Sequence, residues 1–231
     1  LVLENLRFYP GEEANDPVFA KRLAKLGDFY LNEAFSCSHR PHASIVGLPK
    51  LLPAAAGFRF CQEEKILRKV RFSPQRPVVL VVGGVKEDKI EAAQKMASWV
   101  DKVLVGGKLA EAIFKSKDKV RVGKLREDGQ DLDRVTIKQF EEEIKKAGTV
   151  IFAGPVSNTG KGFFEGTKAL FEAALEGEAF VLAGGGDTEA ALTKLGLTDR
   201  IDYISAGGGA MLAYLAKGTL PGIEALEKTR Y

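Results

Sequence analysis

The sequence has 231 residues, 45% of them hydrophobic, which is enough for a packed core in one large domain or two smaller ones. Its net charge of +3 is too small to indicate nucleic-acid binding, although it is compatible with a local basic patch for a small anion. Two cysteines, Cys37 and Cys61, are too few for a disulfide framework of the secreted type and indicate a reducing cytosol, so we expect a cytoplasmic protein. The sequence contains no apolar run of ~20 residues, so we expect no membrane association.

The first third of the chain predicts a small unit. It contains two apolar stretches, residues 1–8 and 29–35, and the first of them has the pattern of a strand. The spacing at 16–26 predicts a helix with Pro17 in its first turn, and helical spacing returns at 63–70 after a basic loop at 36–44. Because the chain starts inside an apolar stretch and without Met, we expect it to be a fragment.

From Pro77 onward one unit repeats, in which a short apolar run ends in glycine and a helical pattern follows. The runs are residues 78–82, 103–105, 150–153, 180–183 and 201–206, and the turns after them are Gly83-Gly84, Gly106-Gly107, Gly154-Pro155, Gly184-Gly185-Gly186 and Gly207-Gly208-Gly209. Because the runs are continuously apolar, they predict strands buried on both faces of a parallel sheet that helices cover. All strand-to-helix turns of such a sheet lie at one edge, where open α/β folds bind ligands.

The glycine turns at this edge suggest a phosphate site. A helix N-terminus presents unpaired backbone N–H groups and a partial positive charge, and glycine lets a phosphate approach closely. Glycine in a single turn is more often there for tight turning alone, but two glycine triplets each open a helix here. After the first triplet, Asp187 could hold Mg²⁺ and Thr188 could donate to a phosphate oxygen, or either could cap the helix that runs to Leu195.

Two other nucleotide motifs are excluded. Gly154 to Lys161 resembles a Walker A loop, but five residues separate Gly154 from Gly160, and Gly162 stands where the motif needs a hydroxyl. No glycine turn has the G-x-G-x-x-G spacing with an acidic residue about 20 positions later, which disfavours a dinucleotide-binding oxidoreductase.

Several motifs, in order along almost the whole chain, resemble the phosphoglycerate kinase family. Residues 3–8 resemble its LENxRF segment, and residues 32–35 with 39–44 resemble its NDAF…HRAHAS loop. Further matches follow at 83–86, 184–188, 205–210 and 220–222. The resemblance implies a two-lobed α/β protein of doubly wound parallel sheets with helices on both faces. The expected units are a remnant of the N-terminal lobe at 1–73, a nucleotide-binding lobe at 74–218, bounded by Pro74 and Pro77, and a tail at 219–231 that returns toward the first lobe.

The resemblance also implies an activity, namely reversible phosphoryl transfer between 1,3-bisphosphoglycerate and ADP, giving 3-phosphoglycerate and ATP, with Mg²⁺ as cofactor and a monomer as the expected state. Arg7, His39 and Arg40 would bind 3-phosphoglycerate, although structural hydrogen bonding is the more frequent role for a histidine such as His39 or His42. The predicted nucleotide-binding residues are Lys86, Lys89, Gly106, Gly107, Gly154, Pro155, Gly184, Gly185, Gly186, Asp187 and Thr188, with Asp187 as the metal ligand. The predicted catalytic residues are Lys86, Gly185, Gly208 and Gly209.

The chain departs from the family pattern in four places. The family's opening segment is absent, so we expect an incomplete N-terminal lobe, a loose tail and no kinase activity from residues 1–231 alone. Lys86 and Lys89 are three residues apart instead of four, Ala153 replaces an asparagine, and the stretch 115–131 is short for part of an adenine pocket. A non-catalytic nucleotide-binding remnant of the same fold is therefore the alternative function.

Overall fold

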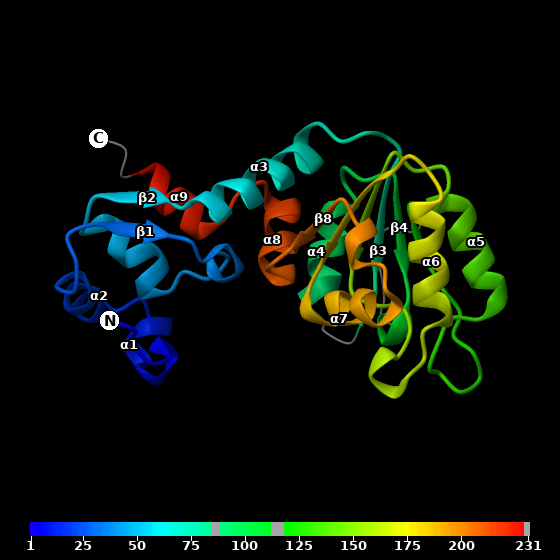
Figure 1. Ribbon diagram of the computed structural model, residues 1–231, viewed down its shortest axis with the longest axis horizontal. Coiled ribbons are helices and arrows are strands. Elements are labelled where there is room, and N and C mark those ends of the chain that lie inside the picture. The colour runs from blue at the N-terminus through cyan, green and yellow to red at the C-terminus, as the bar shows by residue number, and fades with distance from the viewer. Residues whose placement is uncertain (85–87, 112–117, 229–231) are drawn as a thin grey trace.

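The computed structural model describes residues 1–84, 88–111 and 118–228, which form two lobes joined by a long helix (Figure 1). The second lobe is built on a six-stranded parallel sheet with the order β5-β4-β3-β6-β7-β8. Its strands are β3 (Val78–Val82), β4 (Lys102–Val105), β5 (Val120–Val122), β6 (Thr149–Ala153), β7 (Phe180–Gly184) and β8 (Tyr203–Ser205). The five predicted strands are confirmed. β5 is an additional strand, and because it lies partly exposed at the sheet edge, it lacks the apolar run that marks the others.

Helices cover both faces of this sheet (Figure 1). One face carries α4 (Asp88–Met96), α8 (Gly208–Lys217) and part of α3 (Phe58–Phe72), and the other carries α5 (Arg134–Ile144), α6 (Glu165–Leu175) and α7 (Gly186–Leu195). Side chains of β3 alternate between the two layers, since Leu80 packs in the first and Val81 in the second. Full burial of such side chains contributes about 1.5–3 kcal/mol each, which favours a sheet covered on both faces.

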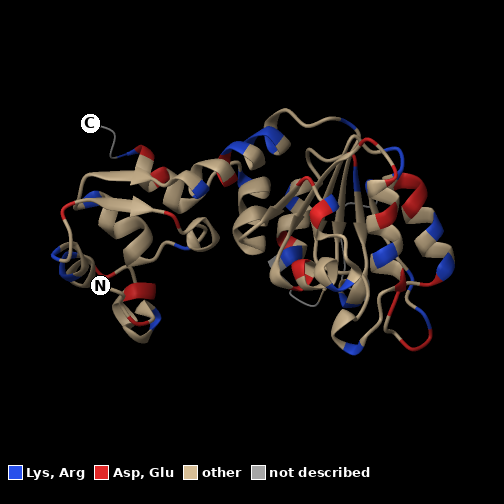
Figure 2. Ribbon diagram, viewed as in Figure 1, with Lys and Arg blue, Asp and Glu red and all other residues tan. Residues whose placement is uncertain are grey.

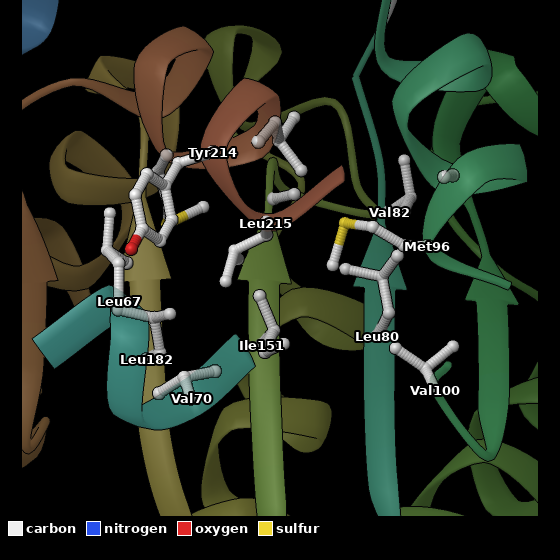
Figure 3. Packing of buried hydrophobic residues seen from close by; sticks show 14 of the residues in the cluster. Leu67, Val70, Leu80, Val82, Met96, Val100, Ile151, Leu182, Tyr214 and Leu215 are labelled. Carbon is white, nitrogen blue, oxygen red and sulfur yellow. The ribbon is translucent and has the colours of Figure 1, made fainter. Parts of the chain in front are cut away.

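The connecting helix α3 belongs to both lobes. Near its N-terminus, Phe60 packs edge-on against Phe35 of the first lobe, with the ring centroids 5.4 Å apart. Farther along, Leu67 and Val70 lie with Tyr214 over the sheet of the second lobe (Figure 3). Because α3 packs on both lobes, its contacts do not mark a boundary at residue 73, and the division into units 1–73, 74–218 and 219–231 stays a prediction.

Trp99, the single tryptophan of the sequence, packs on the apolar cluster to which α3, α4 and α8 contribute. Its indole Nε1 donates a hydrogen bond of 3.1 Å to the carbonyl of Leu215 in α8. The guanidinium carbon of Arg71, at the end of α3, lies 4.8 Å from the ring centroid, within the range of a cation–π contact. The indole ring therefore links the end of the connecting helix to the helical layer over the sheet.

The first lobe consists of short elements around a parallel pair of strands. The strands are β1 (Tyr30–Asn32) and β2 (Ala54–Ala56), and the helical elements are η1 (Leu6–Phe8), α1 (Pro10–Glu13), α2 (Pro17–Ala24), η2 (Phe35–Cys37), η3 (Ala43–Gly47) and η4 (Leu48–Lys50). The predicted helix is confirmed as α2, whose N-cap Asp16 accepts hydrogen bonds from the backbone N–H groups of Val18 and Phe19. Every helix among the described residues is too short or too polar to span a bilayer.

The strand predicted at residues 1–8 is wrong. Leu6–Phe8 form a 3-10 turn, and the Asn5 side chain accepts a hydrogen bond from the backbone N–H of Arg7 at 3.1 Å. This local hydrogen bond forms in place of strand pairing by residues 1–8, since β1 pairs with β2 and with no other strand of the described residues. Phe29, just before β1, and Leu31, within β1, are exposed at 57% and 56%, so this two-stranded sheet leaves large apolar side chains uncovered.

The expectation of a loose tail is also wrong. Residues 221–227 form α9 (Pro221–Glu227), which packs against η3 through Ala225, Ile45 and Val46. At the start of this helix, the backbone N–H of Gly222 donates to the carbonyl of Ser38 at 3.0 Å. The apolar contact and the backbone bond together hold the C-terminal helix on the first lobe, where Figure 1 shows it beside β2.

Candidate active site

Two cavities open at the carboxyl edge of the six-stranded sheet. The first cavity has a volume of about 190 Å³ and is lined by Lys89, Ala153, Gly184, Gly185, Gly186, Asp187, Thr188, Gly208, Gly209 and Leu212. The second cavity has a volume of about 300 Å³ and is lined by Gly84, Gly107, Lys108, Gly129, Gln130, Pro155, Ser157, Asn158, Thr159, Gly160 and Asp187. Because Asp187 lines both, its exposed carboxylate stands where the two cavities meet.

Lys89 lies where the strand order of the sheet reverses. From β3 the chain passes to β4 on one side, whereas β6, on the other side of β3, leads to β7 and β8. The Lys89 Nζ donates to the carbonyl of Gly83, just beyond the end of β3, at 3.0 Å. It also donates to the carbonyl of Ala153, the last residue of β6, at 3.1 Å. Open α/β sheets bind ligands at such a reversal, so Lys89 brings positive charge to the expected place. Figure 2 shows the charged residues of the described part of the chain. Lys86, the other predicted lysine, lies outside the described residues.

The two glycine triplets meet backbone to backbone. Gly185 has φ of +102°, a conformation that favours glycine, and a Cβ added to Gly208 would lie 2.5 Å from the Cα of Gly185. α7 begins at Gly186 and α8 at Gly208, so two helix N-termini converge on the first cavity, and Gly209 lines it as well. Their unpaired N–H groups make this wall of the cavity favourable for an anion.

The two polar residues after the first triplet are used differently. The Asp187 side chain is exposed at the mouth of the cavities, whereas Thr188 is fully buried. The Thr188 hydroxyl donates to the carbonyl of Gly184 at 3.0 Å, which fixes the turn from β7 into α7. Neither side chain caps α7, whose N-cap is Gly185. Donation by Thr188 to a phosphate stays a prediction.

The remaining predicted nucleotide residues separate into two groups. Gly107 and Pro155 line the second cavity. Gly106 and Gly154 are buried behind it, where Gly106 packs against the Val156 side chain and Gly154, with φ of +108°, packs against the carbonyl of Gly83. These two glycines therefore allow close packing at the strand ends.

Sequence reasoning missed most of the wall of the second cavity. Its polar members include Lys108, Gln130, Ser157 and Asn158. A signal was present for the last two, since they directly follow the Gly154-Pro155 turn at a strand end. Gln130 carried no such signal, because it reaches the cavity from a loop between β5 and α5.

The predicted acid-binding residues gather on the first lobe. The Nε of Arg40 donates to the Nε2 of His39 at 3.3 Å, and Arg7 lies 4.0 Å from the carboxylate of Glu13. Burial lowers the pKa of His39, and the charges of Arg40 and, more weakly, Arg7 lower it further. Positive charge therefore concentrates around a neutral imidazole.

The two histidines of this loop have different surroundings. The ring of His39 approaches the position of a Cβ on Gly209 to 3.5 Å, so the basic patch reaches the start of α8 in the second lobe. His42 is buried, with its Nδ1 3.8 Å from a carboxylate oxygen of Glu12. His42 therefore serves the packing of the first lobe.

Metal binding at this edge would rest on Asp187. Within residues 1–84, 88–111 and 118–228, no group of three or more His, Cys, Asp or Glu side chains could hold a metal ion by itself. Mg²⁺ is commonly bound through one or two carboxylates together with substrate phosphates and water. A single exposed carboxylate beside a phosphate-sized cavity therefore fits a metal that arrives with its nucleotide.

Comparison with known proteins gives a consistent family. The phosphoglycerate kinase family model matches residues 1–134 and 125–218. A phosphoglycerate kinase of Thermus thermophilus is 37% identical over 282 residues, which cover 98% of this chain and 72% of the relative. That of Dictyoglomus turgidum is 36% identical over 286 residues, which cover 98% and 71%. Because these alignments are longer than the chain, the relatives contain segments that it lacks within the matched region.

Solved structures agree with the sequence matches. Phosphoglycerate kinase from Coxiella burnetii superimposes with a TM-score of 0.80 at 30% identity, over 97% of this chain and 72% of that protein. The enzyme from Pyrococcus horikoshii OT3 superimposes with a TM-score of 0.82 at 26% identity, over 98% and 72%. The chain thus spans about 72% of the length of the proteins it resembles.

Proposed function

The chain belongs to the phosphoglycerate kinase family, and we propose that its two cavities hold the nucleotide of the family's phosphoryl transfer between 1,3-bisphosphoglycerate and ADP. In this arrangement the phosphates of ADP or ATP occupy the first cavity and the nucleoside occupies the second. The observation that carries the proposal is the meeting of Gly185 and Gly208, which brings two helix N-termini to one cavity with Lys89 on its wall.

Phosphoryl transfer requires that the charge of the transferring group is compensated and that the donor and acceptor oxygens are aligned. The phosphoryl acceptor in the reverse direction is a carboxylate, which carries no proton, so no general base is needed. Lys89 and the N–H groups that begin α7 and α8 would compensate the charge of the transferring group, because they are fixed before the substrate arrives. The glycine turns let phosphate oxygens come close to these N–H groups.

Asp187 is the residue that would hold Mg²⁺. Its exposed carboxylate lies between the two cavities and therefore beside the phosphates in the proposed arrangement. When bound, the ion would supply neutralisation of the phosphate charge. Asp187 itself would orient the nucleotide by restricting where its metal-bound phosphates can lie.

Arg7, His39 and Arg40 would bind 3-phosphoglycerate. The planar fork of a guanidinium group matches a phosphate or a carboxylate with two parallel hydrogen bonds. Burial and Arg40 lower the pKa of His39, and its Nε2 accepts a hydrogen bond from Arg40, so His39 would help to orient the Arg40 guanidinium toward the acid. Since His39 reaches Gly209, the acid patch borders the first cavity, and the two substrates would meet there.

Calorimetric titration tests this assignment. We expect Mg-ADP to bind and Lys89→Ala to weaken it at least tenfold, because removing a charge-assisted contact costs about 1.5–3 kcal/mol. Lys138→Ala, which removes an exposed lysine on α5, serves as the control and should leave the affinity unchanged. If folded protein binds neither Mg-ADP nor Mg-pyrophosphate, the nucleotide assignment is wrong.

A further inference from the structure

A buried polar cluster lies behind the second cavity. It consists of Asp131, Ser157 and Thr167, whose exposed fractions are 0%, 5% and 2%. The Oδ1 of Asp131 accepts hydrogen bonds from Ser157 Oγ at 2.7 Å and from the backbone N–H of Leu132 at 2.8 Å. Its Oδ2 accepts from the backbone N–H of Gly166 at 3.2 Å. One carboxylate therefore joins three segments of the chain.

Ser157 and Thr167 bond each other reciprocally. The backbone N–H of Ser157 donates to Thr167 Oγ1 at 3.0 Å, and the backbone N–H of Thr167 donates to Ser157 Oγ at 2.9 Å. The two hydroxyl oxygens are also 2.9 Å apart, and Ser157 Oγ can accept from Thr167 because its own proton goes to Asp131. Such a closed network allows little movement, because each broken bond leaves a buried polar group unpaired.

The cluster has an electrostatic reason to hold a carboxylate. Gly166 is the second residue of α6, so its N–H is one of the groups that the helix leaves without an internal partner. The residue at the N-cap, Phe164, has no side-chain acceptor, and Asp131 takes this role from another segment. The positive end of the helix dipole thereby stabilises the buried negative charge.

The cluster fixes two residues of the cavity wall that adjoin it in sequence. Gln130 precedes Asp131, and Asn158 follows Ser157; both line the second cavity. The backbone N–H of Asn158 donates to the carbonyl of Gln130, and its Nδ2 donates to Gln130 Oε1, each at 2.8 Å. Gln130 is held in turn by donation from its Nε2 to the carbonyl of Asp128 at 2.8 Å.

This amide pair leaves one acceptor for a ligand. Asn158 Oδ1 accepts no hydrogen bond from any described residue, while one N–H of the same amide donates to Gln130 Oε1. Both matches of the family model, at residues 1–134 and 125–218, include the loop that carries Gln130 and Asp131.

We propose that Asp131 is a positioning residue for nucleotide binding, which holds the Gln130–Asn158 pair so that Asn158 Oδ1 accepts a hydrogen bond from a nucleoside hydroxyl. The inference rests on the proposed placing of the nucleoside in the second cavity. It assigns the discrimination between a nucleotide and a bare phosphate chain to this pair. It gives Asp131 no contact with the ligand.

The test compares Mg-ADP with Mg-pyrophosphate, which carries the phosphates but no nucleoside. Calorimetry with Thr167→Val, Asp131→Asn and Asn158→Ala should show a dissociation constant for Mg-ADP raised about five- to tenfold, as expected for one lost hydrogen bond. The constant for Mg-pyrophosphate should change less than about twofold, because that ligand does not reach the pair.

The matched control is Thr149→Val. Thr149 is equally buried, and its Oγ1 donates to the carbonyl of Gln75 at 2.7 Å, at the opposite edge of the sheet. Thr149→Val should change the affinities for Mg-ADP and Mg-pyrophosphate by less than about twofold, although it also removes one buried hydrogen bond. Equal weakening of both ligands by Thr167→Val, or an unchanged Mg-ADP affinity in Asn158→Ala, would overturn the positioning role. If the unmodified chain binds pyrophosphate but shows no preference for ADP, the nucleoside placing is itself wrong.

Discussion

Glu63 of the connecting helix accepts a hydrogen bond of 2.7 Å from the backbone N–H of Ala206, in the turn before the second glycine triplet. The carboxylate is buried, and its neighbour Tyr203 has a pKa raised to about 12, first by burial and then by the charge of Glu63. The helix that joins the lobes is thus tied to a wall of the first cavity.

This neighbourhood gives a titration prediction. Glu63→Gln keeps an acceptor for Ala206 but removes the negative charge, so the pKa of Tyr203 should fall from about 12 while staying above 10, because burial remains. Ring-labelled tyrosine resonances, assigned with Tyr203→Phe, would follow the titration. An unchanged pKa for Tyr203 would mean that the charge of Glu63 does not act on this ring.

The contact of the glycine triplets gives a stability prediction. Gly208→Ala should lower the free energy of unfolding by about 1–3 kcal/mol, because the new methyl group would overlap the backbone of Gly185. Gly186→Ala is the control, since a Cβ there meets nothing within 4 Å, and it should be neutral or stabilising by up to about 1 kcal/mol. Urea unfolding would measure both, and equal effects would contradict the close approach at residue 208.

His39 gives a pH prediction with a definite sign. Its pKa in the folded chain is below the ordinary 6.5, because of burial and then of Arg40, so the unfolded chain takes up the proton first. Protonation of His39 therefore favours unfolding as pH falls through about 6.5 toward the folded-state pKa, and contributes nothing above about pH 7.5.

The variant His39→Leu removes this proton linkage. The stability of the unmodified chain relative to His39→Leu should decline between about pH 7.5 and pH 5, as followed by urea unfolding. Because the sequence has two histidines, proton NMR would resolve the His39 titration directly. A relative stability that rises toward acid pH would show that the imidazolium form is favoured in the folded protein.

Arg40 gives a prediction for the acid substrate. Arg40→Ala should weaken the binding of 3-phosphoglycerate about 10- to 150-fold, the equivalent of one charge-assisted contact of ~1.5–3 kcal/mol, and should leave Mg-ADP nearly unchanged. Arg22→Ala removes an exposed arginine in the last turn of α2, whose charge is not among those that act on His39, and should change neither affinity. Similar losses for both ligands in Arg40→Ala would place Arg40 outside the acid patch.

The second lobe could be predicted from the sequence because its strands are buried on both faces. Val78–Val82 and Thr149–Ala153 are buried throughout and almost entirely apolar, and glycines mark the strand ends where the ligand edge lies. β5 escaped prediction because its Val-Arg-Val pattern reflects a half-exposed edge. The error at residues 1–8 has the opposite cause, since the apolar pattern suits a strand but no partner strand is available within the described residues.

The site was predictable where glycine geometry carried the signal. Gly185, Asp187 and Gly208 could be placed at one edge because strand-to-helix turns of a parallel sheet converge there. The bonds of Lys89 and Thr188 to backbone carbonyls could not be foreseen, because they depend on the distance between neighbouring strand ends. Nor could the pairing of Gln130 with Asn158, which lie 28 residues apart in sequence.

Trp99 makes the joint between connecting helix and sheet lobe optically visible. The sequence has one tryptophan, so intrinsic emission excited at the red edge of the absorption band comes from this ring alone. Its indole N–H is bonded to α8, whose N-terminus borders the first cavity, and Arg71 of α3 lies over its face. A ligand that shifts α8 or rotates α3 would change the polarity and the quenching around the fluorophore. The chain thus carries a native reporter of lobe movement that needs no label.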